Sequence, residues 1–276
     1  MRGLLAMVVL LVTAGTFGVS AQAASHPSNA VSHHPRVTEK GGHGTGGGGS
    51  GLGWASSNWS GYAVTGTTYS SVTGGWTVPT VSATSGATYS SAWVGIDGFG
   101  NTSLIQTGTE QDYYGGAAHY AAWWEILPAS VTFIPACSVS VTTNCITVSH
   151  GDTMAASISK GVSGWSITLT DSSNGNSFTT TGLAYAGPGT SAEWIVEAPT
   201  VGGRLATLAR YGSTVFDHGT ANGASPALVK ADGGVMIQRH GSVSTPSSPD
   251  SPESDASASD GFAIAYGSSA PAAPSS

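Results

Sequence analysis

Acidic side chains alternate with tryptophans in two stretches of this sequence, Ser91–Leu127 and Ser191–Pro199. The polar side chains there that are best suited to chemistry are Asp97, Gln106, Glu110, Glu125, Glu193 and Glu197. Carboxylates can accept and return protons, so they can act as general bases and acids. The sequence has no Gly-x-Ser-x-Gly elbow, no HExxH zinc motif and no phosphate-binding loop, and its later histidines lie in no recognisable triad context. Carboxylate chemistry is therefore the best-supported kind.

Strand periodicity would bring these side chains to one surface, because successive residues of a strand point to opposite faces. One set is polar and aromatic: Trp93, Gly95 and Asp97; Leu104, Gln106, Gly108 and Glu110; Trp123, Glu125 and Leu127; Glu193, Ile195 and Glu197. The other set is mostly apolar and typical of a core: Ala92, Val94 and Ile96; Ile105; Ala122, Trp124 and Ile126; Ala192, Trp194 and Val196. The first set predicts a concave, ligand-binding face.

The composition indicates that these strands belong to an all-β protein. Only 8% of the 276 residues are charged, and 40 glycines and 13 prolines imply many turns. Strands are expected near Ser57–Val64, Ser71–Val78, Tyr89–Ile96, Ser103–Thr109, His119–Ile126, Val131–Phe133, Thr153–Ser159, Trp165–Thr170, Ser177–Leu183, Ala192–Glu197, Thr214–Phe216, Ala227–Lys230, Val235–Gln238 and Phe262–Tyr266. Arg204–Arg210 is the one candidate helical turn, and Thr245–Asp260 is expected to be a mobile loop. The pattern predicts a β-sandwich of two large antiparallel sheets, of the jelly-roll or concanavalin-like kind.

The charge balance argues against nucleic acid as a partner. The formal net charge is -7, with only 8 Lys and Arg, whereas phosphate binding needs clustered basic residues. A surface with few ion pairs also has few to lose when carboxylates are protonated, which is compatible with an acidic medium.

Four segments are expected: a secretory signal peptide over 1–23, a propeptide or disordered leader over 24–51, the β-sandwich domain over 52–267, and a disordered tail over 268–276. The signal peptide is indicated by Arg2, the apolar run Leu4–Val12 and a small-x-small site at Ala21 to Ala23. No later stretch is long and apolar enough to anchor the chain in a membrane. We therefore expect a secreted, extracellular protein.

The leader, Ala24–Gly51, differs in composition from the rest of the chain. Its basic and histidine residues are His26, His33, His34, Arg36, Lys40 and His43, against the single acid Glu39. The absence of periodicity favours a disordered leader or linker. The alternative is a basic propeptide that covers an acidic cleft. Metal binding by His33 and His34 is a third possibility, although nothing in the sequence fixes a coordination geometry.

The two cysteines, Cys137 and Cys145, are predicted to form a disulfide because the chain is expected to be secreted. A bridge across so short a loop would stabilise the fold by roughly 2–3 kcal/mol in the chain-entropy account. A catalytic thiol is the rival interpretation, but no histidine forms a recognisable motif with either cysteine.

Six blocks of the sequence resemble the glutamic peptidases, also called eqolisins. The blocks are Asn58 to Tyr62, Gly75 to Pro79, Ala92 to Gly98, Ile105 to Gly108, Trp123 to Glu125 and Ala192 to Glu197. They follow the family's order from about Trp54 to Gly267, so the resemblance covers essentially the whole sandwich domain and implies that 52–267 is the catalytic domain.

The resemblance implies an acid endopeptidase that is insensitive to pepstatin, with the catalytic dyad Gln106 and Glu193. It further implies the substrate-binding residues Trp59, Trp93, Asp97, Trp123 and Glu125. Protein or peptide substrates are expected, with no cofactor and no metal, and we expect a monomer.

Alternatives remain open from the residues alone. Glu197 could replace Glu193 as the catalytic acid, and Asp97 and Glu125 could be hydrogen-bond anchors rather than substrate contacts. A β-sandwich glycoside hydrolase would use a carboxylate pair such as Glu125 and Glu193. A carbohydrate-binding module would use only the tryptophans.

Overall fold

The computed structural model describes residues 31–38, 51–250 and 259–275 and is built almost entirely of strands. The elements are β1 (Val31–Ser32), β2 (Trp54–Ser56), β3 (Trp59–Thr65), β4 (Ser71–Thr77), β5 (Ser91–Ile96), β6 (Ile105–Tyr114), β7 (Ala117–Ile126), β8 (Thr132–Phe133), β9 (Thr153–Gly161), β10 (Gly164–Asp171), β11 (Asn176–Leu183), β12 (Ser191–Glu197), β13 (Thr200–Val201), β14 (Arg204–Leu205), β15 (Ser213–Ala221), the 3-10 helix η1 (Lys230–Asp232), β16 (Gly233–Ile237), β17 (Val243–Pro246) and β18 (Phe262–Tyr266). The predicted signal peptide lies outside the described residues. Within them, no helix has the length and apolar character needed to cross a membrane.

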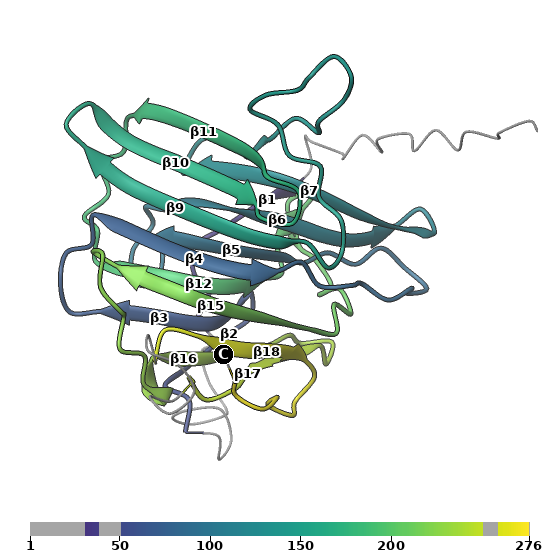
Figure 1. Cartoon of the computed structure of the whole chain (residues 1–276). Coiled ribbons are helices and arrows are strands. Elements are labelled where there is room, and N and C mark those ends of the chain that lie inside the picture. The colour runs from purple at the N-terminus through teal and green to yellow at the C-terminus, as the bar shows by residue number, and fades with distance from the viewer. Residues whose placement is uncertain (1–30, 39–50, 251–258, 276) are drawn as a thin grey trace, which may run out of the picture.

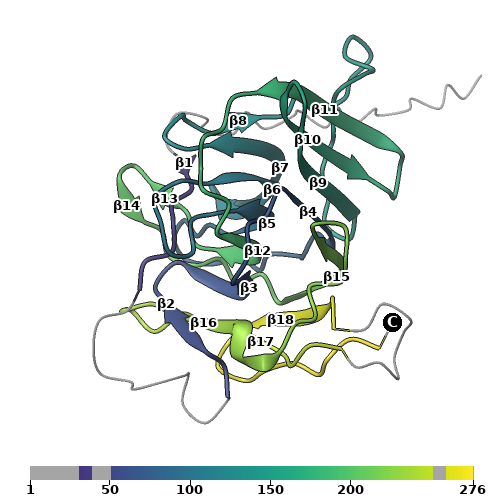
Figure 2. The ribbon, with the colours of Figure 1, turned by 90° about the vertical axis from the view of Figure 1, so that its left-hand side faces the viewer.

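The strands form two packed layers (Figures 1 and 2). One layer runs in the order β11-β10-β9-β4-β15, the other in the order β3-β12-β5-β6-β7, and β18, β17 and β16 join the two at one edge. Neighbouring strands are antiparallel except for the short parallel pair of β2 and β16. The predicted β-sandwich of antiparallel sheets is confirmed, with the added finding that hydrogen bonding continues from one layer to the other.

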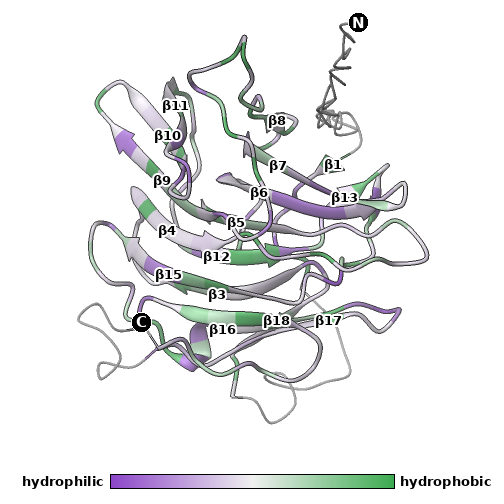
Figure 3. Ribbon diagram, turned by 45° about the vertical axis from the view of Figure 1, so that its right-hand side comes forward, coloured by the Kyte–Doolittle hydropathy of each residue, from purple (hydrophilic) through white to green (hydrophobic). Residues whose placement is uncertain are grey.

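The main core lies between the layers. It contains Val94, Ile96 and Trp194 from one layer and Trp76 and Ile158 from the other, all essentially buried. Figure 3 shows hydrophobic segments, in green, in strands of both layers. The layers meet closely where the Trp194 indole donates a hydrogen bond to the Thr73 carbonyl at 2.8 Å. A Cβ on Gly74 would come within 2.7 Å of that indole, so glycine is required at this crossing.

A second apolar cluster covers the other face of the β3-β12-β5-β6-β7 layer. Its buried members are Trp54, Trp59, Ala63, Trp93, Leu104, Trp123, Val131 and Ile195. The predicted division into two faces is therefore confirmed: the apolar set of side chains joins the main core, while the tryptophans of the polar set pack on the outside of the layer. We call this outer surface the acidic face. It is formed by Trp59, Ser91, Trp93, Gly95, Gln106, Glu110, Trp123, Glu125, Glu193 and Glu197.

Three local expectations are wrong. Ala227–Lys230 is not a strand, since Ala227 has a positive φ of 51° and a 3-10 turn follows. Arg204–Arg210 contains the short strand β14 instead of a helical turn. The expected loop Thr245–Asp260 begins later, because Thr245 and Pro246 belong to β17 and the Ser247 N–H donates to the Ala263 carbonyl at 2.7 Å.

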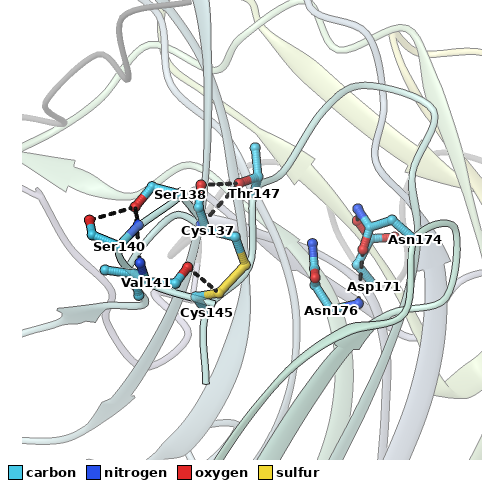
Figure 4. Close-up of a disulfide and its surroundings, with 9 residues drawn as sticks. All are labelled: Cys137, Ser138, Ser140, Val141, Cys145, Thr147, Asp171, Asn174 and Asn176. Atoms are coloured by element: carbon cyan, nitrogen blue, oxygen red, sulfur yellow. Dashed lines mark hydrogen bonds between the residues drawn. A yellow bond between two sulfur atoms is a disulfide. The ribbon is translucent and has the colours of Figure 1, made fainter. Parts of the chain in front are cut away.

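The predicted disulfide is confirmed between Cys137 and Cys145 (Figure 4). Within its loop, Ser138 and Val141 exchange backbone hydrogen bonds. The loop is also tied to the sheet, because the Thr179 N–H on β11 donates to the Asn144 side chain at 2.7 Å. The bridge therefore closes an ordered turn on the rim of the β9-β10-β11 layer.

Candidate active site

Strand register places Glu193 and Gln106 in one row across the acidic face. Gly95 on β5 is the Cα partner of Glu193 on β12 and also of Gln106 on β6. Gln106 in turn pairs with Glu125 on β7. Since neighbouring strands lie about 4.8 Å apart, the Cα atoms of Glu193 and Gln106 are separated by about 10 Å. Both side chains project to the same face, with no side chain between them at Gly95.

Trp93 forms the floor between these two side chains. A Cβ on Gly95 would come within 2.8 Å of Cζ3 of the Trp93 ring, so the ring lies close over the glycine. The Trp93 indole N–H donates to Oε2 of Glu197 at 2.9 Å, which fixes the ring. Glycine at position 95 is thus required by the packing that supports the row.

Gln106 is oriented by Glu125. Its amide Nε2 donates to Oε2 of Glu125 at 2.9 Å, and both side chains are buried. Burial raises the pKa of Glu125 to about 7, with Glu197 adding to the rise while His33 and Gln106 oppose it. The amide oxygen of Gln106 has no hydrogen-bond partner in the described part of the chain. Glu125 therefore acts as a hydrogen-bond anchor for Gln106.

The Glu193 carboxyl group is buried, but other residues do not engage its oxygens in well-formed hydrogen bonds within the described part of the chain. Burial raises its pKa well above the usual range; the Ser191 hydroxyl lowers it and Asp97 raises it. Among the described residues, neither of its oxygens makes a hydrogen bond of good geometry. A carboxyl group with free oxygens and a perturbed pKa is suited to proton transfer.

A second row lies four residues further along the same strands. Ser91 on β5 is the Cα partner of both Glu197 on β12 and Glu110 on β6. His33 enters this row from the N-terminal segment: its Nε2 lies 2.9 Å from Oε1 of Glu110 and its Nδ1 lies 3.3 Å from Oε2 of Glu197. The imidazole also stacks on Trp123, with ring centroids 3.7 Å apart and an interplanar angle of 9°.

The charges in this second row depend on one another. Burial alone would lower the pKa of His33, but Glu110 and Glu197 outweigh it and raise that pKa well above its usual value. Burial raises the pKa of Glu110, His33 lowers it, and Glu197 raises it again. Asp112, further along β6, also has a pKa well above its usual value because of burial and the neighbouring Glu110.

Comparison with known proteins decides the family. Residues 57–257 match the Peptidase A4 family. Aspergillopepsin-2 of Aspergillus niger is 34% identical over 220 residues, which cover 70% of this chain and 74% of that protein. The chain belongs to the peptidase A4 family of glutamic peptidases. Scytalidopepsin B of Scytalidium lignicola is 37% identical over 103 residues, covering 37% of this chain and 35% of the relative.

The fold of this glutamic peptidase agrees with a solved relative. The structure of scytalido-glutamic peptidase with a transition state analog inhibitor covers 76% of this chain and 98% of its own, with a TM-score of 0.59 at 22% identity. Membership in a peptidase family also removes the two carbohydrate-directed alternatives. The geometry agrees, because Gly95 and Gln106 separate Glu193 from Glu125, the carboxylate pair considered for a glycoside hydrolase.

Asp97 serves a different purpose in this peptidase from the acids of the two rows. Its carboxylate accepts hydrogen bonds from the side chains Tyr185, Asn101 and Thr190 and from the backbone N–H groups of Gly189 and Thr190. Burial alone would raise the pKa of Asp97, but these bonds lower it below its usual value. The contacts favour an anchor that holds the loop before β12, rather than a substrate contact.

The N-terminal segment 31–38 lies across the acidic face of the peptidase. Its first strand, β1, pairs with β13. The His34 carbonyl accepts a hydrogen bond from the Trp59 indole at 3.0 Å, and the His34 N–H donates to Glu197 at 3.1 Å. Arg36 then packs over the ring of Phe99 at 4.0 Å and donates to the Phe99 carbonyl.

The structure thus brings Trp59, Trp93, Trp123, Glu125 and the two proposed dyad residues together, and sets Asp97 apart. Glu110 and Glu197 can be recognised from the sequence as acids of this face, but the sequence does not show that they face each other or that His33 enters between them. Spacing gave a partial signal, since Glu193 and Glu197 on β12 repeat the interval between Gln106 and Glu110 on β6.

Proposed function

We propose that this glutamic peptidase is a secreted acid endopeptidase in which Glu193 and Gln106 form the catalytic dyad around an activated water. The observation that carries the proposal is the row in which these two side chains face each other across Gly95, over the Trp93 ring. Peptide hydrolysis needs a base for water, a donor for the developing oxyanion and an acid for the leaving amine. Two neighbouring side chains can supply all three.

In the proposed reaction, ionised Glu193 takes a proton from water as the water oxygen bonds to the carbonyl carbon. The Gln106 amide donates a hydrogen bond to the oxyanion that forms. Glu193 then returns its proton to the peptide nitrogen as the C–N bond breaks, leaving a carboxylic acid and an amine. A carboxamide is neutral at every pH, so Gln106 does not repel ionised Glu193 as a second carboxylate would. This route requires neither a covalent intermediate nor a metal.

We further propose that Ala24–Gly51 is a propeptide and that the active form lacks it. In the structure, Glu193, Gln106 and Glu110 are fully buried, and residues 31–38 lie on the same face. The raised pKa of Glu193 belongs to this covered state. Water reaching the carboxyl group after the segment leaves would lower that pKa again and allow ionisation in acid.

The test is digestion of a denatured protein at acidic pH by the wild-type chain and by its Glu193→Gln and Glu197→Gln variants. Glu193→Gln removes the base and the acid together, so proteolysis should be abolished. Glu197→Gln should keep measurable proteolysis, because Glu197 is held by Trp93 and lies outside the dyad row. If Glu197→Gln were inactive while Glu193→Gln kept near-wild-type activity, Glu197 rather than Glu193 would be the catalytic acid.

A further inference from the structure

Glu110 and Glu197 are fully buried and face each other across Ser91. Two carboxylates that share a buried place disfavour each other's ionised form unless a cation lies between them. Among the described residues, the cationic side chain between them is His33, which comes from outside the sandwich. The space between these two acids of the sandwich domain therefore requires a positive group from another segment.

The contacts of His33 define which positive group fits. Each ring nitrogen lies against a different carboxylate, Nε2 against Glu110 and Nδ1 against Glu197. Only the protonated imidazole can donate from both nitrogens at once. The ring also lies flat on Trp123 at 3.7 Å, a contact that suits a planar cation. A lysine ammonium has no flat face, so it would use the carboxylates without the stacking surface.

We propose that Glu110, Glu197 and Trp123 form a subsite for a histidine side chain of the substrate, and that the chain's own His33 occupies it in this structure. This inference rests on the proposed function, since it names a substrate feature that the same face recognises.

The subsite is close enough to the dyad to direct cleavage. The His33 backbone lies near enough to Glu125 to lower the pKa of its carboxyl group, and Glu125 is the residue that holds Gln106. Glu197 and Glu193 are four residues apart on one strand, a separation of about 13 Å. An extended peptide covers that distance in about four residues. A substrate whose histidine fills the subsite would therefore present its backbone to Glu193 and Gln106.

The first experiment measures binding without turnover. The full chain carries Glu193→Gln to silence the dyad, together with His33→Ala and His34→Ala so that an added peptide can displace the weakened leader from the subsite. The probes are the peptide Val-Ser-His-His-Pro-Arg-Val-Thr, which copies residues 31–38, and the same peptide with its first histidine replaced by glutamine. Calorimetry at about pH 5 keeps the imidazole charged.

The histidine peptide should bind about tenfold or more tightly than the glutamine peptide, because it alone makes charge-assisted contacts with both carboxylates. The difference should largely disappear when Glu110→Gln or Glu197→Gln is added to the chain. Asp217→Asn, an acid-to-amide change on β15 in the opposite layer, should preserve it. Equal, measurable affinities of the two peptides overturn the subsite; since both peptides then bind the same protein, a folding defect cannot explain that result.

The second experiment separates the subsite from the proposed function. The chain with His33→Ala and His34→Ala, but with an intact dyad, digests a denatured protein in acid, and its cleavage sites are read by mass. Histidine should be enriched at one fixed position relative to the broken bond. Proteolysis without that enrichment, together with equal peptide binding, overturns the subsite and leaves the function standing. Absence of proteolysis with a retained difference in binding overturns the function and leaves the subsite standing.

Discussion

The acidic face carries two rows of the same construction. In each, an acid on β12 faces a polar side chain on β6 across a small residue on β5. In the first row the partner of Glu193 is the carboxamide of Gln106, and in the second the partner of Glu197 is the carboxylate of Glu110. The second row holds a histidine between its two acids, with its nitrogens 2.9 and 3.3 Å from them.

The difference shows what a neutral partner contributes. A carboxamide lets one buried acid stand beside a polar neighbour without a counter-ion, so the space between them is left for reactants. Two carboxylates at the same spacing need a cation, which makes that row suited to binding. In the proposed function and subsite, the replacement of one acid by one amide therefore distinguishes the row proposed for reaction from the row proposed for recognition.

The largest expected effect comes from making the rows alike. Gln106→Glu gives the first row the charges of the second, removes the oxyanion donor and raises the pKa of Glu193 through like-charge repulsion. We expect turnover of a denatured protein in acid to fall on the order of 10²–10³-fold. Gln106→Ala is the control, since it removes the donor without adding charge. Wild-type turnover in the Gln106→Glu enzyme would show that neutrality at this position is irrelevant.

The second prediction concerns the cation of the second row. Attachment of residues 31–38 requires charged His33 and ionised carboxylates. The pKa of His33 is raised, so this charge is lost only as pH rises above neutral, whereas the attraction by Glu110 is lost as pH falls through the pKa of its carboxyl group. After removal of the signal peptide, the leader should remain attached near pH 6 and be cleaved at about pH 3.5, below the ordinary carboxylate range.

His33→Ala should accelerate leader loss near pH 6 by about tenfold, because the two acids then face each other without a cation. The measurement is a pH series that follows leader cleavage by mass. A Glu193→Gln chain, which cannot cleave itself, should keep its leader throughout. Equal loss of the leader at the two pH values, or its loss from the Glu193→Gln chain without added protease, would contradict this prediction. The leader would then be only a spacer that other enzymes trim.

The third prediction is that the leader-bearing chain is more stable in acid than at pH 8. Burial raises the pKa of Glu110, Asp112, Glu125 and Glu193. The folded state therefore binds protons more tightly than the unfolded chain, and this stabilisation is lost as pH rises through the raised values. Glu125 alone, with a pKa of about 7, contributes on the order of 3 kcal/mol. The raised pKa of His33 acts in the same direction, whereas the lowered pKa of Asp97 opposes it only in strong acid.

Thermal unfolding of the Glu193→Gln chain, which keeps its leader, between pH 4 and 8 checks this prediction. The midpoint should rise as pH falls, and Glu125→Gln, which cannot titrate, should flatten part of that rise. A midpoint that increases toward pH 8 would contradict the prediction. It would mean that the buried acids are ionised and bonded to partners that the two rows do not contain.

The smallest expected effect is that of inhibitors of other peptidase classes, which should leave proteolysis unchanged. The proposed dyad uses no serine or cysteine nucleophile and no metal, so serine-directed reagents, thiol alkylators and chelators should leave proteolysis intact. Pepstatin should also fail, because the first row pairs an acid with an amide rather than with a second acid. Activity that a chelator removes and zinc restores would reveal a metal requirement outside both rows.

The two faces of the strands could be predicted because they depend only on local alternation. Trp194 and Val94 lie in the core and Trp93 and Glu193 on the acidic face, as the spacing indicates. The register could not be predicted in the same way. Whether Ser91 lies opposite Glu110 depends on the loop that joins β5 to β6 and on packing across the sheet, and neither is encoded in the residues of one strand. The path of His33 depends on contacts made more than 70 residues away in sequence, with Glu110 and Glu197.

The short strand β1 has a consequence for the protein that remains when the leader is gone. Val31 and Ser32 pair with Val201 and Thr200, at the side of β13 opposite β14. Their departure turns β13 into an edge strand whose N–H and C=O groups face outward unpaired. An extended polypeptide can add to such an edge through its main chain alone, whatever its side chains. If the active form lacks the leader, as proposed, this short edge of β13 becomes open to pairing with an extended chain, which a compact protein cannot supply as readily.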